Sequence, residues 1–127
     1  MNSRNHKVLI VEDNAMDISI AKALVSIFVP ENAVDLVRTA EDAINLCRRN
    51  DYSIILADYF LEGRLTGSDL FNFCENLENE THFIFMTSLN AFGISQIFPS
   101  PRNRQFGHLQ KPYRISQAGQ LIRNLLD

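Results

Sequence analysis

Residues 8–14 read Val-Leu-Ile-Val-Glu-Asp-Asn, four apolar side chains followed at once by two acids and an asparagine. An uninterrupted run of apolar, mostly β-branched residues predicts a short strand that is buried on both faces, as in a parallel sheet covered by helices. Asn14 is a favoured residue for capping a helix, so a helix is expected to begin directly after the acids. The stretch therefore predicts the first strand of an α/β protein, with two carboxylates at its end.

The same pattern recurs along the chain. Apolar runs at residues 54–57 and 83–86 predict two more buried strands, and residues 106–109 predict a weaker fifth strand. Residues 33–37 predict a strand that Asp35 marks as an edge. Stripes with helical spacing separate the strands, and they span residues 14–28, 40–47, 68–77 and 115–126. In the last helix the inward stripe is Ile115, Ala118, Ile122 and Leu125. This alternation predicts a flavodoxin-like, doubly wound α/β fold with a five-stranded parallel sheet in the order 2-1-3-4-5.

Residues 88–105 interrupt this regularity. Gly93, Pro99 and Pro101 limit the segment to a short helix, around residues 91–98. Residues 99–104 carry two arginines between prolines and polar residues, which is typical of an exposed basic loop. We therefore expect an irregular or shortened fourth helix.

Composition limits the class of protein. A length of 127 residues fits one domain spanning residues 1–127, and 46% hydrophobic residues exclude a disordered chain. Twelve basic against fifteen acidic residues give a net charge of −3, which argues against direct binding of nucleic acid. With no membrane-length apolar run and no signal peptide, we expect a cytoplasmic protein without membrane association. Cys47 and Cys74 lie on apolar helix stripes, which favours buried free thiols over a disulfide.

Polar and charged side chains follow the predicted strands. Glu12 and Asp13 end the first strand, Asp58 the third and Thr87 the fourth, and Lys111 follows the fifth. Ligand sites of this fold form outside the carboxyl ends of the strands, so these side chains should meet. Two unit charges ~4 Å apart repel by about 4 kcal/mol at an effective dielectric of 20, so three converging carboxylates need a cation. Oxygen ligands without histidine suit Mg²⁺.

Four segments resemble the receiver domains of two-component response regulators, in particular the single-domain, chemotaxis-regulator-like members. They are residues 8–14, residues 55–61 (Ile-Leu-Ala-Asp-Tyr-Phe-Leu), residues 86–88 (Met-Thr-Ser) and residues 111–113 (Lys-Pro-Tyr). The resemblance extends from about Lys7 to Leu126. It implies that Asp58 accepts a phosphoryl group from a histidine kinase or a histidine phosphotransfer protein, as a signalling switch or phosphorelay intermediate. Phosphorylation would then change the binding of a downstream effector protein.

The resemblance also implies how the acids act. Asp13 and Asp58 would bind Mg²⁺, with the backbone carbonyl of Phe60 as a third ligand. Glu12 would act mainly through a water molecule bound to the metal. The chain would therefore catalyse only its own phosphorylation and dephosphorylation, and would not be an enzyme in the metabolic sense.

Thr87 and Lys111 would bind the phosphoryl oxygens, Thr87 after reorienting, and the peptide bond before Pro112 would be cis. Most receivers carry an aromatic residue three positions before the lysine, whereas this chain has His108. His108 is either an altered switch residue that works with Thr87 or an ordinary strand residue.

Three other functions have an acid or a phosphate site at the same strand ends or share the same fold. A haloacid-dehalogenase-like phosphohydrolase needs a second aspartate two residues after its nucleophile, where this chain has Phe60. A nucleotide- or flavin-binding module needs a phosphate-binding loop after the first strand, where Glu12 and Asp13 would repel phosphate. A pseudo-receiver, which acts as a protein-interaction module without phosphorylation, stays open because residues 88–105 depart from the receiver pattern.

Overall fold

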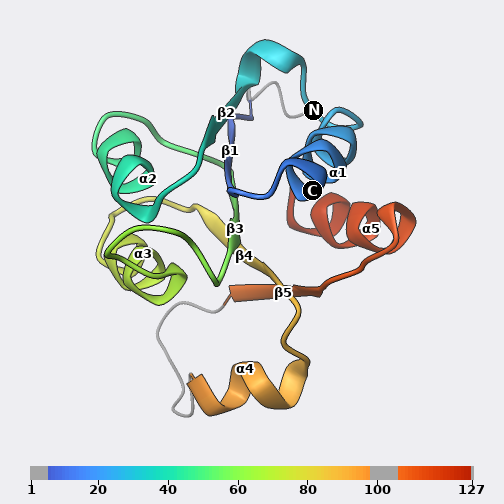
Figure 1. Cartoon of the computed structure of the whole chain (residues 1–127). Coiled ribbons are helices and arrows are strands. Elements are labelled where there is room, and N and C mark those ends of the chain that lie inside the picture. The colour runs from blue at the N-terminus through green and yellow to red at the C-terminus, as the bar shows by residue number, and fades with distance from the viewer. Residues whose placement is uncertain (1–5, 98–105, 127) are drawn as a thin grey trace.

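The structure, a computed structural model, describes residues 6–97 and 106–126 (Figure 1). A five-stranded parallel sheet has the order β2-β1-β3-β4-β5, which confirms the predicted doubly wound fold. Its strands are β1 (Val8–Val11), β2 (Val34–Val37), β3 (Ile54–Asp58), β4 (His82–Thr87) and β5 (Phe106–Gln110). The helices are α1 (Ala15–Val25), α2 (Ala40–Cys47), α3 (Gly67–Glu75), α4 (Ala91–Ile97) and α5 (Ile115–Leu126), with a 3-10 helix η1 (Glu31–Ala33).

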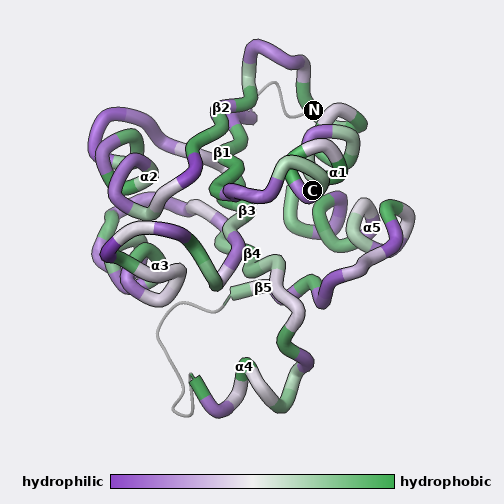
Figure 2. Tube along the Cα trace, in the orientation of Figure 1, coloured by the Kyte–Doolittle hydropathy of each residue, from purple (hydrophilic) through white to green (hydrophobic). Residues whose placement is uncertain are grey.

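Helices cover both faces of the sheet (Figure 1). Leu9 and Val11 of β1 pack with α2 and α3 on one face, whereas Val8 and Ile10 pack with α1 and α5 on the other. These four side chains are at most 2% exposed, which explains why β1 is a continuous apolar run rather than an alternating one. The central strands β1, β3 and β4 form the hydrophobic middle of the tube in Figure 2. The faces of β1 thus offer no polar side chain, and the candidate polar residues lie at the strand ends.

Two predicted boundaries shift where the chain turns tightly. Helix α1 ends at Val25 rather than at Phe28, because the amide of Phe28 bonds to the carbonyl of Val25 at 2.9 Å in a tight turn. Strand β2 begins at Val34 rather than one residue earlier, because η1 precedes it. The predicted edge position of β2 is confirmed.

Two side chains differ from the predicted stripes. Ile115 was expected to face the core, but it is 38% exposed at the first position of α5, outside the packed middle of that helix. Phe71 is fully buried and joins Leu70 and Cys74 in the core, so the buried face of α3 is wider than a narrow stripe. Its ring packs edge-on against the ring of Phe83 in β4.

Within the described residues, helix α4 spans Ala91–Ile97, which agrees with the predicted short helix as far as Ile97. In the described part of this helix Ile94 is buried, whereas Phe92 is 70% exposed. The predicted basic loop, residues 99–104, and the last residue of the predicted short helix lie outside the described residues.

Side-chain caps fix where the helices begin, close to the strand ends. The side-chain Oδ1 of Asn14 accepts a hydrogen bond from the amide of Asp17 at 3.0 Å, as its position in the sequence predicted. The Thr39 hydroxyl accepts from the amide of Asp42 at 3.1 Å in the same way. Each helix therefore starts within a few residues of the preceding strand, which sets the first turn of α1 beside the carboxyl end of the sheet.

Two further expectations concern the state of the cysteines and the presence of a membrane-spanning helix. Cys47 and Cys74 are buried thiols that form no disulfide, as predicted. Among the described helices, none combines the length and the hydropathy that a membrane span needs.

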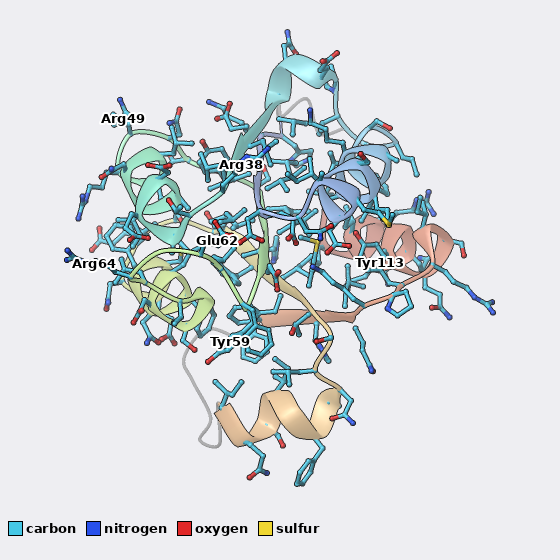
Figure 3. All side chains as sticks on the ribbon, viewed as in Figure 1. Arg38, Arg49, Tyr59, Glu62, Arg64 and Tyr113 are labelled. Atoms are coloured by element: carbon cyan, nitrogen blue, oxygen red, sulfur yellow. The ribbon has the colours of Figure 1, made fainter. Side chains whose placement is uncertain are left out.

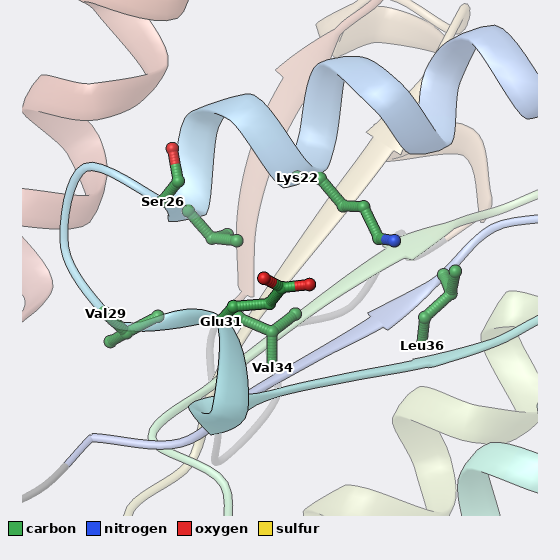
Figure 4. A pocket seen from close by; sticks show the side chains of 7 residues that line it. Lys22, Ser26, Val29, Glu31, Val34 and Leu36 are labelled. Carbon is green, nitrogen blue, oxygen red and sulfur yellow. The ribbon is translucent and has the colours of Figure 1, made fainter.

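A cavity of about 370 Å³ lies between the C-terminal half of α1 and β2 (Figure 4). Its lining is mostly apolar, with charged groups added, and consists of Lys22, Val25, Ser26, Val29, Glu31, Val34 and Leu36. None of the residues at the carboxyl ends of the strands lines it. The cavity is therefore separate from the polar cluster described next.

Candidate functional site

The structure brings the predicted acids together at the carboxyl edge of the sheet. Glu12 directly follows β1, and its amide bonds to the carbonyl of Val37 in β2 at 3.0 Å. Asp58 is the last residue of β3, the strand on the other side of β1. One carboxylate oxygen from each of Glu12, Asp13 and Asp58 lies within 4.8 Å of the others. Because β1 and β3 are neighbours in the sheet, Asp58 lies beside Glu12 and Asp13 although it is far from them in the sequence.

Lys111 closes this cluster from the end of β5. Its ammonium nitrogen lies 2.8 Å from Glu12 Oε2 and 3.4 Å from Asp58 Oδ2. Its backbone amide donates to the carbonyl of Thr87 at 2.7 Å, which ties the ends of β4 and β5 together. The peptide between Lys111 and Pro112 is cis, as the resemblance implied.

Asp17 is a member of this site that sequence reasoning missed. Its Oδ2 lies 2.8 Å from the Lys111 ammonium, closer than the nearest oxygen of Asp58. From the sequence, Asp17 was expected only to take part in the N-terminal cap of α1. A weak signal was present, because Asp17 lies in the first turn of a helix that begins directly after Glu12 and Asp13.

Backbone amides orient the carboxylates. The amide of Phe60 donates to Asp58 Oδ1 at 3.1 Å, and the amide of Glu62 donates to Asp13 Oδ2 at 3.1 Å. The amides of Asp13 and Asn14 both donate to Glu12 Oε1 at 3.2 Å. One oxygen of each acid is thereby held by the backbone.

The loop between β3 and α3 supplies two of these amides and is fixed in turn. The backbone of Glu62 forms an isolated parallel β-bridge with that of Thr39, and the amide of Arg64 donates to Glu41 Oε2 at 3.1 Å. Glu62 and Arg64 are both exposed, and in the view of Figure 3 Glu62 lies near the middle whereas Arg64 lies at the periphery. At the end of the loop, a Cβ atom on Gly67 would come within 2.9 Å of the Asp58 carbonyl, so only glycine permits this close return. The loop is therefore built to hold its amides against the site.

Negative charge exceeds positive charge here. Burial raises the pKa of Glu12 and of Asp58, against the opposing influence of Lys111. Burial alone would lower the pKa of Lys111, but hydrogen bonds to Asp17 and Glu12 raise it above its usual range. The site thus holds four carboxylates, those of Glu12, Asp13, Asp17 and Asp58, and one ammonium group, which contacts three of them. An all-oxygen donor set with unbalanced buried charge fits a hard divalent cation such as Mg²⁺.

Thr87 and His108 meet through one intervening residue. The Thr87 hydroxyl, which is fully buried, accepts a hydrogen bond from the amide of Leu89 at 3.2 Å. His108 Nε2 donates to the carbonyl of Leu89 at 2.8 Å. The segment that connects β4 to α4 is thus held from both sides at Leu89.

Phe60, whose carbonyl was predicted as a metal ligand, follows Asp58 by two residues and is 55% exposed.

Solved structures with this architecture are receiver domains of signalling proteins. The receiver domain of the sensor histidine kinase PA1611 from Pseudomonas aeruginosa PAO1 has a TM-score of 0.78 and 23% identity, over 97% of this chain and 98% of that chain. That structure is described with a magnesium ion coordinated in its active site cleft. The chain has the fold of a receiver domain.

Two further structures share this receiver fold at lower identity. The signal receiver domain of an HD domain-containing protein from Pseudomonas fluorescens Pf-5 has a TM-score of 0.80 and 17% identity, over 97% of this chain and 95% of that chain. The DrrB receiver domain activated by BeF3 has a TM-score of 0.78 and 16% identity, over 97% and 98% of the two chains. No protein-family model matches the chain, and no curated protein sequence matches it.

The raised pKa values of Glu12 and Asp58 predict how stability depends on pH when divalent cations are removed. In the range above an ordinary carboxyl pKa the folded chain binds more protons than the unfolded chain, so stability falls as the pH rises. Asp58→Asn removes one buried charge, and we expect it to raise the free energy of unfolding at pH 7.5 by on the order of 1 kcal/mol. The gain should shrink toward pH 5. Urea unfolding in a chelator, followed by circular dichroism, measures both.

Asp42→Asn is the control for this experiment, because it removes the same charge from an exposed position. It should leave the stability unchanged or lower it slightly, since an acid near a helix N-terminus is favourable. A loss of stability in Asp58→Asn at pH 7.5 would contradict the account of unbalanced charge.

Proposed function

We propose that residues 1–127 form one receiver domain that accepts a phosphoryl group on Asp58 and thereby changes the binding of a downstream effector protein. The observation that carries this proposal is the environment of the Asp58 carboxylate. One oxygen is held by the amide of Phe60, and the other lies 3.4 Å from the ammonium of Lys111, inside a cluster of acids. A carboxylate so placed is oriented, largely shielded from water and next to a positive charge.

In the proposed reaction a carboxylate oxygen of Asp58 attacks the phosphorus of a phosphohistidine on a histidine kinase or histidine phosphotransfer protein. The new O–P bond forms as the P–N bond breaks, and the departing imidazole nitrogen keeps the electron pair. Nucleophile and phosphoryl group are both electron-rich, so the transfer depends on positioned positive charge. Lys111 supplies one such charge and would pair with a phosphoryl oxygen.

Mg²⁺ is the proposed cofactor. Asp13, Asp58 and the backbone carbonyl of Phe60 would bind it, and Glu12 would act mainly through a metal-bound water. When bound, the ion would supply the remaining positive charge on the phosphoryl oxygens. The amide of Glu62 holds one oxygen of Asp13 in place, so the other oxygen is left for the metal.

Thr87 and His108 are the proposed switch residues. To bond a phosphoryl oxygen, the Thr87 hydroxyl would turn away from its present partner, the amide of Leu89. The carbonyl of the same residue is held by His108, so a change at Thr87 would be passed to the β4–α4 connection and to the ring. A local change of charge would thus bias the position of a loop on the surface.

We propose a cytoplasmic signalling role, which the proposed partners and the two thiols support. A receiver acts as a signalling phosphoacceptor and not as an enzyme with a turning-over substrate. The two buried cysteines form no disulfide, which suits the reducing cytoplasm in which histidine kinases deliver phosphoryl groups.

Phosphorylation with a small-molecule donor tests the proposal directly. With acetyl phosphate and Mg²⁺, we expect the intact mass to increase by one phosphoryl group, because Asp58 is already oriented beside Lys111. The increment should disappear in Asp58→Asn and in the presence of a chelator. Asp42→Asn, an exposed acid near the same edge, is the control and should still be modified. An unmodified wild-type chain with every donor tried would favour the pseudo-receiver.

The switch is tested by removing the hydrogen bond of His108 while keeping a ring. In the wild type, beryllofluoride with Mg²⁺ should shift the amide NMR signals of Thr87, of Leu89 and of α4. In His108→Phe the shift at Thr87 should persist and the shifts in α4 should be largely lost, because the Leu89 carbonyl has lost its donor.

His82→Phe is the control for the switch, since His82 is an exposed histidine at the opposite end of β4. It should respond to beryllofluoride as the wild type does. Identical α4 shifts in His108→Phe and the wild type would rule out a switch role for His108.

A further inference from the structure

Lys111 is bound more closely by another residue than by the proposed phosphoacceptor. An ammonium group has three N–H donors, and the three carboxylates around Lys111 use all of them. The distances from Nζ are 2.8 Å to Glu12, 2.8 Å to Asp17 and 3.4 Å to Asp58. The longest of the three contacts is therefore the one that the proposed reaction needs.

Asp17 differs from the other two acids in its position. Its side chain is 31% exposed, whereas those of Glu12 and Asp58 are 0% and 12% exposed, so it lies at the outer rim of the site. It is also outside the Glu12–Asp13–Asp58 cluster that fits a divalent cation. A cation bound in that cluster would therefore not use an oxygen of Asp17.

Helix α1 keeps Asp17 in this position. The backbone amide of Asp17 is held by the Asn14 side chain at 3.0 Å, which leaves the carboxylate free to point at Lys111. The cap thus links the end of β1 to the rim of the site. A charged hydrogen bond of this length to a half-buried ammonium is stronger than an ordinary surface ion pair.

On the basis of the proposed function, we propose that Asp17 is a positioning residue that competes with the phosphoryl group on Asp58 for the Lys111 ammonium. A phosphoryl oxygen gains Lys111 only as the bond to Asp17 weakens. Asp17 would therefore lower the affinity of the Asp58 site for a phosphoryl group or its mimic.

The affinity for beryllofluoride, a tetrahedral mimic of the phosphoryl group, tests this inference. Titration calorimetry with saturating Mg²⁺ should show tighter binding to Asp17→Asn than to the wild type, by about fivefold for one lost charged hydrogen bond. Asp42→Asn is a matched control, because Asp42 is the third residue of α2 as Asp17 is of α1 and its amide is held by a cap in the same way. It should bind beryllofluoride like the wild type.

The second readout does not depend on phosphoryl chemistry. In the free wild-type chain, the Lys111 ammonium should give a slowly exchanging ¹⁵N NMR signal, because Asp17 and Glu12 hold two of its protons. The signal should be lost or broadened in Asp17→Asn and kept in Asp42→Asn. A purely structural role for Asp17 would change stability and leave this signal in place.

Three outcomes would overturn the inference. Equal or weaker binding by Asp17→Asn would exclude competition while the proposed function stands. An equal gain in Asp42→Asn would show that bulk charge, and not the contact with Lys111, sets the affinity. If the wild type binds no beryllofluoride, the proposed function fails and the role of Asp17 fails with it, even where the ¹⁵N signal shows the contact.

Discussion

The convergence of buried carboxylates on one ammonium group is the constraint on which the rest of the site depends. A parallel sheet brings the carboxyl ends of its strands to one edge, and here three of those ends carry Glu12, Asp58 and Lys111. Burial makes the acids costly to ionise, and one lysine does not balance them. Backbone amides, helix caps and the loop after β3 all serve to keep this charge in place. A site under such a constraint favours any ligand that adds positive charge.

The fold and most of the site could be predicted because each depends on local patterns. Continuous apolar runs such as residues 8–11 identify strands that are covered on both faces, and an acid directly after such a run lies at the sheet edge. Asp17 could not be predicted with the same certainty, since an acid in the first turn of a helix is common for reasons of capping alone. The exposure of Ile115 was also missed, because the end of an amphipathic stripe packs less than its middle. These errors concern contacts between distant elements, which periodicity does not encode.

The hydrogen bonds around Leu89 extend the account from the acids to the surface. Thr87 and His108 hold the amide and the carbonyl of one residue, so the end of β4, the start of the α4 connection and β5 share a single junction. Lys111 joins the same junction through its backbone bond to Thr87. A short chain of hydrogen bonds therefore connects the charged site to the β4–α4 connection, and the proposed phosphorylation switch depends on this connection.

The central claim is that unbalanced acids at the strand ends form a magnesium site. Calorimetric titration of Mg²⁺ into the wild type and into Asp13→Asn tests it most directly, because Asp13 contributes an oxygen to the cluster without contacting Lys111 in the described hydrogen bonds. The account predicts one Mg²⁺ bound by the wild type and a loss of affinity of at least about tenfold in the variant. No binding by the wild type, or equal binding by both chains, would contradict it.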